Sequence, residues 1–161
     1  MAGLVPSRRD RAWEYQTFAQ GSSTTYVKGS LLVLNGARDV VEYNQASSHS
    51  QILGIAMHDS SNTLPTGKCL VAVPLESGAR FWADLNTGMT ASQLSLGQAY
   101  GISKSVSAGT TPTSYLTTLA TSVWSRLATI VGPVDSKLSR VECTFIQNAM
   151  VFGSVSSTSL A

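Results

Sequence analysis

Charged side chains are scarce in this chain, since Lys, Arg, Asp and Glu together make up 12% of its 161 residues. So small a share argues against a helical bundle whose surface is covered by ion pairs. No apolar run approaches the roughly 20 residues that a membrane span needs. The first twenty residues are polar and do not match a signal peptide, so we expect a protein that is made in a cytoplasm and has no membrane partner.

Cysteine and histidine are equally rare. The two cysteines, Cys69 and Cys143, lie far apart, and neither belongs to a group with zinc-ligand spacing. Each lies in an apolar run, so we expect two buried, reduced thiols rather than a disulfide framework. The two histidines, His49 and His58, fall in polar segments. We expect both to be solvated loop residues.

Catalytic and cofactor signatures are missing as well. Residues 66–69 faintly resemble a phosphate-binding loop, but Asn62 stands where the first glycine is required. Cys69 replaces the Ser or Thr that would bind Mg²⁺ in such a loop. The carboxylates are scattered along the chain. We therefore predict no enzymatic activity, no cofactor and no metal.

The excess positive charge is concentrated near the start of the chain. Three arginines and Asp10 give a net charge of +2 within the first eleven residues, and the remaining eight basic and eight acidic side chains cancel. A near-neutral body lacks the basic face that phosphate recognition needs, so we predict no nucleic-acid partner. Aromatic residues follow the arginines, a combination that suits docking onto a protein. The predicted docking residues are Arg8, Arg9, Arg11, Trp13, Tyr15 and Phe18.

Two other interpretations of this segment stay open. The arginines are also compatible with a solvated, disordered terminus in the free protein. The aromatic residues are equally compatible with a segment that is pinned to its own domain. In each case we predict an extended N-terminal arm over residues 1–20, followed by one domain over 21–155 and a flexible tail over 156–161.

Short apolar runs separated by turn residues dominate the rest of the chain and predict a mainly β fold. Asn35 and Gly36 separate two such runs, which favours a hairpin. A glycine interrupts each of the runs 52–56 and 130–134, and a glycine inside a strand often marks a bulge. Residues 90–93 resemble a helix cap, and residues 116–127 have helical spacing weakened by β-branched side chains. We predict a compact small β-barrel or sandwich with at most one or two short helices. The expected strands lie within 30–34, 37–43, 51–57, 68–75, 79–85, 98–100, 127–131, 141–146 and 149–155.

The order of these features resembles the decoration (cement) proteins of tailed-bacteriophage capsids. The resemblance covers about 110 residues and is carried by strands of the form apolar–Gly–apolar, in the segments Gly29–Leu32, Ile52–Ala56, Gly67–Val73 and Ala128–Gly132. It implies a non-enzymatic structural protein on the outer surface of the virion. It also implies a homotrimer that binds the major capsid protein at subunit junctions, with an N-terminal arm that adds to a capsid sheet.

Two alternatives differ from this expectation in class. The first is a carbohydrate- or receptor-binding β module of a phage fibre or tail. Its aromatic residues would be Trp82, Tyr100, Tyr115 and Trp124, together with polar side chains on the same face. The second is a hydrolase with a cleft around His58 or a pair of carboxylates.

Overall fold

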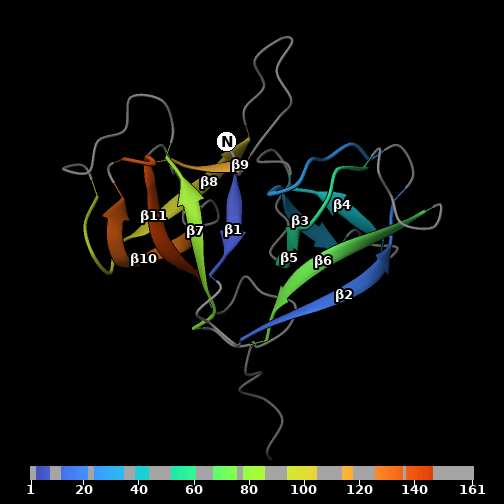
Figure 1. The fold of residues 1–161 in the computed structure, drawn as a ribbon, viewed down its shortest axis with the longest axis horizontal. Helices are drawn as coiled ribbons and strands as arrows, with labels where there is room; N and C mark the ends of the chain where they lie inside the picture. Colours follow the sequence, from blue (N-terminus) through green and yellow to red (C-terminus); the bar gives the residue numbers. More distant parts are fainter. Residues whose placement is uncertain are drawn as a thin grey trace, which may run out of the picture.

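The fold consists of two curled antiparallel sheets (Figure 1). The structure is a computed structural model and describes residues 3–7, 12–21, 24–34, 39–43, 52–60, 67–75, 78–85, 94–104, 114–117, 126–135 and 137–146. All the regular elements within these residues are strands. The predicted mainly β fold, a small barrel or sandwich, is therefore confirmed. Nowhere in this part of the chain does a helix have the length and apolar character to cross a membrane.

One sheet has six strands. Their order across the sheet is β1 (Leu4–Pro6), β7 (Arg80–Asp84), β11 (Arg140–Phe145), β10 (Arg126–Asp135), β8 (Ala99–Lys104) and β9 (Ser114–Thr117). The strand β11 shows the pattern of a sheet with one face on the core, because its residues alternate between buried and half-buried along its length. In Figure 1 this sheet occupies the left half of the molecule.

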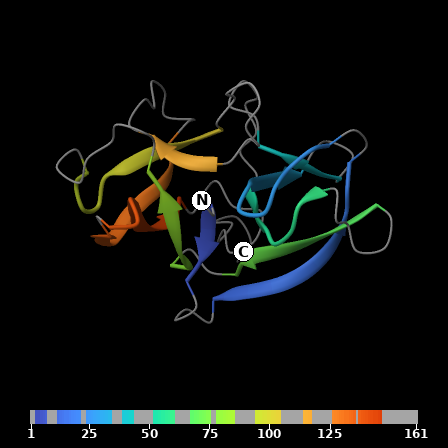
Figure 2. The same cartoon turned by 45° about the horizontal axis from the view of Figure 1, so that its top comes forward.

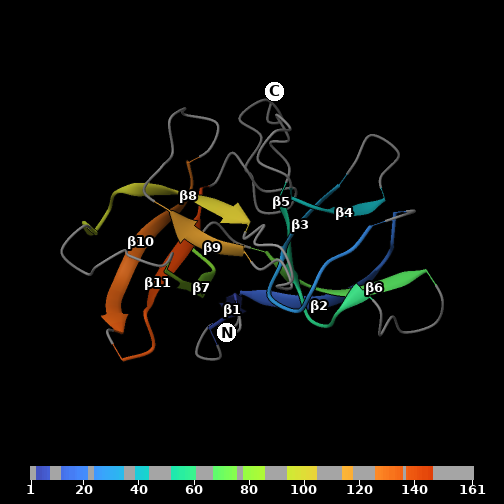
Figure 3. The ribbon, with the colours of Figure 1, turned by 90° about the horizontal axis from the view of Figure 1, so that it is seen from above.

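The other sheet has five strands and occupies the right half of the same view. Their order is β2 (Trp13–Ala19), β6 (Lys68–Pro74), β5 (Ile52–Ala56), β3 (Leu31–Leu34) and β4 (Val40–Glu42). The strands β2 and β6 form a long, curved ribbon on the outer side of this sheet (Figure 2). A third view from above keeps the same division into two sheets (Figure 3).

The buried apolar side chains form two cores, and the larger one holds the two sheets together. The larger core combines residues of both sheets, among them Leu31, Ile55, Phe81 and Phe145. The smaller core lies on the other side of the five-stranded sheet and includes Cys69. The five-stranded sheet is therefore apolar on both of its faces, which explains why β5 reads as an uninterrupted apolar run.

A bulge in β5 lets its side chains serve both cores. Ile52 and Ile55 both point into the larger core although they are three residues apart. Strict alternation would place them on opposite faces. The pairing of β3 with β5 shifts by one residue at this point, with Leu32 opposite Gly54 and Val33 opposite Ile52. The extra residue restores the face of Ile55.

Glycine is required at position 54 because β6 comes very close there. A Cβ atom on this residue would lie 2.1 Å from the carbonyl oxygen of Ala72. The predicted bulge at the second glycine-interrupted run is also present, since the pairing of β10 with β11 shifts between Ile130 and Val134. A Cβ atom on Gly132 would lie 2.3 Å from a carboxylate oxygen of Glu142.

Most of the predicted strands are found where the sequence placed them. The runs 30–34 and 37–43 form the antiparallel pair β3 and β4, as the hairpin prediction required. The predicted strands at 51–57, 68–75, 79–85, 98–100, 127–131 and 141–146 correspond to β5, β6, β7, β8, β10 and β11. The predicted helical turn at 90–93, the last predicted strand at 149–155 and the tail at 156–161 lie outside the described residues. The ambiguous segment 116–127 is described only at its ends, which belong to the strands β9 and β10.

The first twenty residues need a different description from that of a separate arm. Leu4 to Pro6 form β1, which pairs with β7, and Trp13 to Ala19 form β2, which pairs with β6 along its whole length. Leu4 and Trp13 are both buried in the larger core. The described part of this segment is extended, but it is built into both sheets, because its apolar side chains complete the core between them.

We expect Gly54→Ala to be strongly destabilising, because its new methyl group would have to displace the backbone of β6. Overpacking costs about 1–3 kcal/mol of the free energy of unfolding, and we expect the upper end here because the clash is with backbone. Gly78→Ala is the matched control, since a Cβ atom at that position meets nothing within 4 Å. Urea denaturation measures both variants, and equal stabilities would contradict the close approach of β5 and β6.

Candidate functional site

Trp13, one of the predicted docking residues, belongs to the core. Its indole packs edge-on against Phe81 and Phe145, with ring centroids 6.5 and 6.3 Å away. Its Nε1–H donates a hydrogen bond of 2.8 Å to the carbonyl oxygen of Arg80. Trp13 thus joins β2 of one sheet to β7 and β11 of the other, which is the interpretation in which the aromatic residues pin the segment to its own domain.

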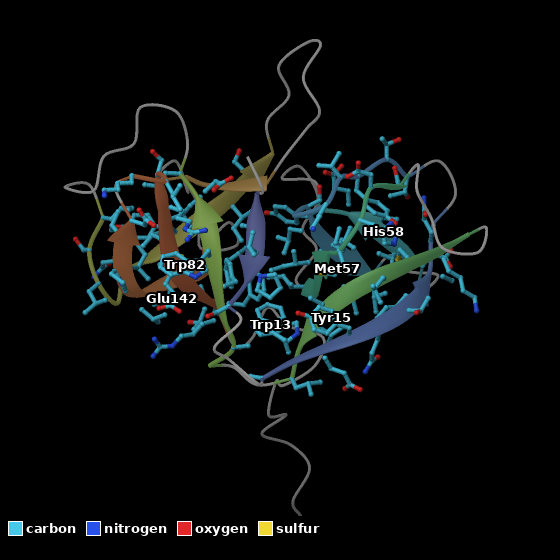
Figure 4. The ribbon with its side chains drawn as sticks, in the orientation of Figure 1. Trp13, Tyr15, Met57, His58, Trp82 and Glu142 are labelled. Carbon is cyan, nitrogen blue, oxygen red and sulfur yellow. The ribbon has the colours of Figure 1, made fainter. Side chains whose placement is uncertain are left out.

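The other predicted docking residues have different environments. Phe18 is half-buried against the smaller core. Tyr15 is 56% exposed and is the exposed aromatic side chain of β2 (Figure 4). Arg8, Arg9 and Arg11 lie outside the described residues. The structure therefore leaves Tyr15 as the described side chain of this set that is available to a partner.

The backbone N–H and C=O groups of β2 alternate between pointing toward β6 and pointing away from the sheet. Gln20 N–H donates to the carbonyl oxygen of Gly67 and Leu75 N–H donates to that of Ala12, both over 2.8 Å. In an antiparallel pair, residues that exchange hydrogen bonds alternate with residues that face away. The even-numbered residues of β2 therefore direct their N–H and C=O groups toward β6. The odd-numbered residues, namely Trp13, Tyr15, Thr17 and Ala19, direct theirs away from the sheet.

In the part of the chain that the structure describes, the strand β2 is consequently an open edge. It is the outermost strand of the five-stranded sheet, and it is seven residues long. Its only charged side chain is that of Glu14. A long edge strand with few charges readily pairs with another extended chain, because its donors and acceptors already have the required spacing. We take this edge, together with the exposed Tyr15, as the candidate functional site.

The outer face of the six-stranded sheet carries the main group of charged side chains among the described residues. Arg80 lies 3.4 Å from Glu142, and Arg140 lies 3.7 Å from Asp135. The guanidinium of Arg140 also stands over the ring of Trp82, 4.7 Å from its centroid. Each of these two carboxylates is held by an arginine. The four side chains therefore resemble a balanced network of surface ion pairs and not an acid and a base arranged for catalysis.

These contacts also bear on the carbohydrate-binding alternative. Trp82 is half-buried and the Arg140 guanidinium covers one face of its ring, where a sugar would have to stack. The hydroxyl oxygen of Tyr100 accepts a hydrogen bond from Ser95 N–H over 2.9 Å. Trp124 and the side chain of Tyr115 lie outside what the structure describes. Of this set, Trp82 therefore has one ring face occupied by a side chain of the protein itself.

His58 has a structural role that the sequence did not predict. Its Nε2 accepts a hydrogen bond of 2.9 Å from Leu70 N–H. Its Nδ1 lies 2.9 Å from the carbonyl oxygen of Asp59, so the proton of a neutral imidazole belongs on Nδ1. The side chain is half-buried and links the turn after β5 to β6 (Figure 4). The expectation of a solvated loop histidine is therefore wrong for His58, whereas His49 lies outside the described residues.

The two cysteines are buried and free, as predicted. Burial away from water raises the pKa of the Cys143 thiol from 9.0 to about 12, and the neighbouring Glu142 charge adds to this shift. Burial also raises the pKa of the Cys69 thiol. Both groups are therefore held as neutral thiols, which are poor nucleophiles and poor metal ligands. In the part of the chain that the structure describes, no three His, Cys, Asp or Glu side chains gather as a metal site would require.

Comparisons with known proteins add no relative. No protein-family model, no curated protein and no solved structure matches this chain.

We expect His58→Ala to lower the free energy of unfolding by roughly 1–3 kcal/mol, because it leaves the half-buried Leu70 N–H without its acceptor. Lys68→Ala, an exposed substitution in the same strand, should change stability by less than about 0.5 kcal/mol. Chemical denaturation of the two variants provides the comparison. Equal effects would show that the imidazole does not anchor β6.

The raised pKa of Cys143 predicts how stability depends on pH. Below pH 9.0 the thiol is protonated in both states, and its contribution to stability is complete. Between pH 9.0 and about 12 the unfolded thiol loses its proton while the folded thiol keeps it, so stability falls as the pH rises. The contribution of this group is at most about 1.4 kcal/mol per pH unit. Denaturation of Cys143→Ala over the same pH range should give a shallower fall, and identical slopes would contradict this account.

Proposed function

We propose that this protein is a structural virion component that decorates and stabilises the mature capsid of a tailed phage. It binds major capsid protein subunits near their junctions, on the outer surface of the particle. The observation that supports this proposal is the open edge of β2, which directs the backbone groups of alternate residues away from the sheet. An extended segment of a capsid subunit adds to this edge as a further strand.

Strand addition suits a decoration protein for a physical reason. Each backbone hydrogen bond contributes roughly 0.5–1.5 kcal/mol net, so a strand of a few residues binds with moderate affinity. Many copies engage one particle, and the junctions are clamped by the sum of these contacts. No catalytic group, cofactor, nucleic acid or membrane is needed for such a role.

The side chains around the edge fit the same role. Tyr15 offers a large exposed ring beside the edge, and aromatic side chains of this kind contribute strongly at protein interfaces. Glu14 is the single charge that an incoming strand meets on β2. The arginines at positions 8, 9 and 11 directly precede the strand in sequence and add attraction to an acidic capsid surface.

We expect Tyr15→Ser to weaken binding to expanded capsids assembled from the major capsid protein by about tenfold, because it removes the aromatic anchor beside the edge. Co-sedimentation with increasing protein concentration gives the affinity and the number of bound copies. Leu138→Ser is the matched control, because Leu138 is similarly exposed (54%) but lies in the turn between β10 and β11 of the other sheet.

Equal weakening by both substitutions would contradict a capsid contact at β2. Absence of saturable binding by the unmodified protein would overturn the proposed function itself. Deleting residues 1–15 is a poor test, since the deletion removes the buried Leu4 and Trp13 and with them part of the core.

A further inference from the structure

The described strands at the edges of the two sheets differ in how well they are covered. At β1, Leu4 N–H donates to the carbonyl oxygen of Gly29 over 3.0 Å, and Pro6 has no N–H to offer. At β4, the carbonyl oxygen of Val40 accepts a hydrogen bond from Gly21 N–H over 2.9 Å. At β9, Leu116 forms a bridge with Leu85. The chain thus uses its own segments to cover three short edges.

The edge strand β2 is longer than these three and lacks a comparable contact among the described residues. It is seven residues long, whereas β1 and β4 have three residues and β9 has four. Tyr15, Thr17 and Ala19 direct their N–H and C=O groups outward, and within the described part of the chain no hydrogen bond is recorded beyond this edge. An uncovered edge of this length favours pairing with another strand, because unpaired backbone groups on a nearly uncharged edge promote association.

The sequence of β2 is complementary to itself. In an antiparallel pair centred on Gln16, Tyr15 lies opposite the partner's Thr17, and Trp13 lies opposite the partner's Ala19. All four odd-numbered residues then fall into hydrogen-bonded pairs, which supplies about eight hydrogen bonds between the strands. Shifting the register by two residues leaves one of these residues without an opposite residue from the other strand.

The side chains agree with this register. Glu14, the only charge of the strand, lies opposite the partner's Phe18 and not opposite a second carboxylate. Like charges directly across a pair of strands are destabilising, so this placement is favourable. Tyr15 opposite the partner's Thr17 is an aromatic and β-branched pair, which stabilises antiparallel strands. On the axis, the two Gln16 amides face one another and can exchange hydrogen bonds.

We infer that the free protein associates through β2 with a second copy of itself, in an antiparallel pair about a twofold axis at Gln16. The pairing joins two five-stranded sheets into one continuous sheet and closes both open edges. The interface is isologous, so the assembly stops at two copies and does not grow into fibres. On this point the edge favours two copies in solution over the three that the resemblance implies. If the proposed function holds, the capsid segment competes with the second copy for the same edge.

The decisive experiment is a disulfide placed on the axis. Gln16→Cys brings two thiols face to face across a non-hydrogen-bonded pair, where the Cα atoms lie about 4.5 Å apart, a separation that a disulfide can span. Mild oxidation should then convert the full-length protein to a covalent dimer that reductant reverses. Glu14→Cys is the matched control, because its thiol faces the partner's Phe18 and should not cross-link. The native Cys69 and Cys143 are buried and do not compete.

A second pair of variants tests the backbone contact. Thr17→Pro removes an outward N–H without touching the bonds of β2 to β6, and proline is tolerated at such a position of an edge strand. We expect this variant to be a folded monomer by light scattering, with a melting temperature that no longer depends on protein concentration, whereas Thr17→Val should remain a dimer. If Thr17→Pro fails to fold, the comparison of Gln16→Cys with Glu14→Cys still tests whether two copies pair through β2.

Each outcome separates this inference from the proposed function. A monomer or a trimer of the unmodified protein, or equal cross-linking at positions 14 and 16, would overturn the pairing through β2. A dimer that does not co-sediment with capsids would support the pairing and overturn only the capsid role. A monomer that binds capsids would support the capsid role and overturn the pairing through β2.

Discussion

The fold is held by the apolar contact between its two sheets, and Trp13 of β2 takes part in that contact. Phe81 and Phe145 stack on one another with centroids 4.3 Å apart, and the Trp13 indole meets both rings edge-on. Aromatic groups of this size bury large areas and fix relative orientation through their preferred geometries. The indole N–H also donates a hydrogen bond to the backbone of β7, so the position of Trp13 is fixed by a polar contact as well as by apolar packing. This anchor ties β2 to the core at one end and leaves the rest of its outer edge open.

The hydrogen bonds at the edges of the two sheets distinguish β2 from the other described edge strands. A folded chain satisfies nearly all its buried backbone groups, and edges of sheets are the places where that requirement is met by other means. Here the edges at β1, β4 and β9 are covered by Gly29, Gly21 and Leu85. The edge of β2 presents instead an unbroken series of alternate donors and acceptors with an exposed tyrosine beside them. An edge that offers backbone groups suits assembly, and the two partners proposed for it are a capsid subunit and a second copy of the chain.

The groups that could have served chemistry are used for structure. The imidazole of His58 connects a turn to β6, and the thiols of Cys69 and Cys143 are protonated core groups. The described carboxylates Asp135 and Glu142 are each paired with an arginine. The same strands therefore explain both the stability of the sheets and the absence of an evident reactive pair among these residues.

Most of the local structure follows from patterns in the sequence. Apolar runs and turn residues located most strands, the glycines at 54 and 132 marked the two bulges, and the flanking apolar residues placed both cysteines in the core. These features could be predicted because they depend on residues close in sequence. The three-dimensional fold was needed to learn that β1 pairs with β7 and that His58 supports β6. It was also needed to learn that Trp13 is a core residue and that Tyr15 remains exposed on an open edge. Such outcomes depend on which distant strands become neighbours, and a local pattern of apolar and polar residues carries no information about the partner it will meet.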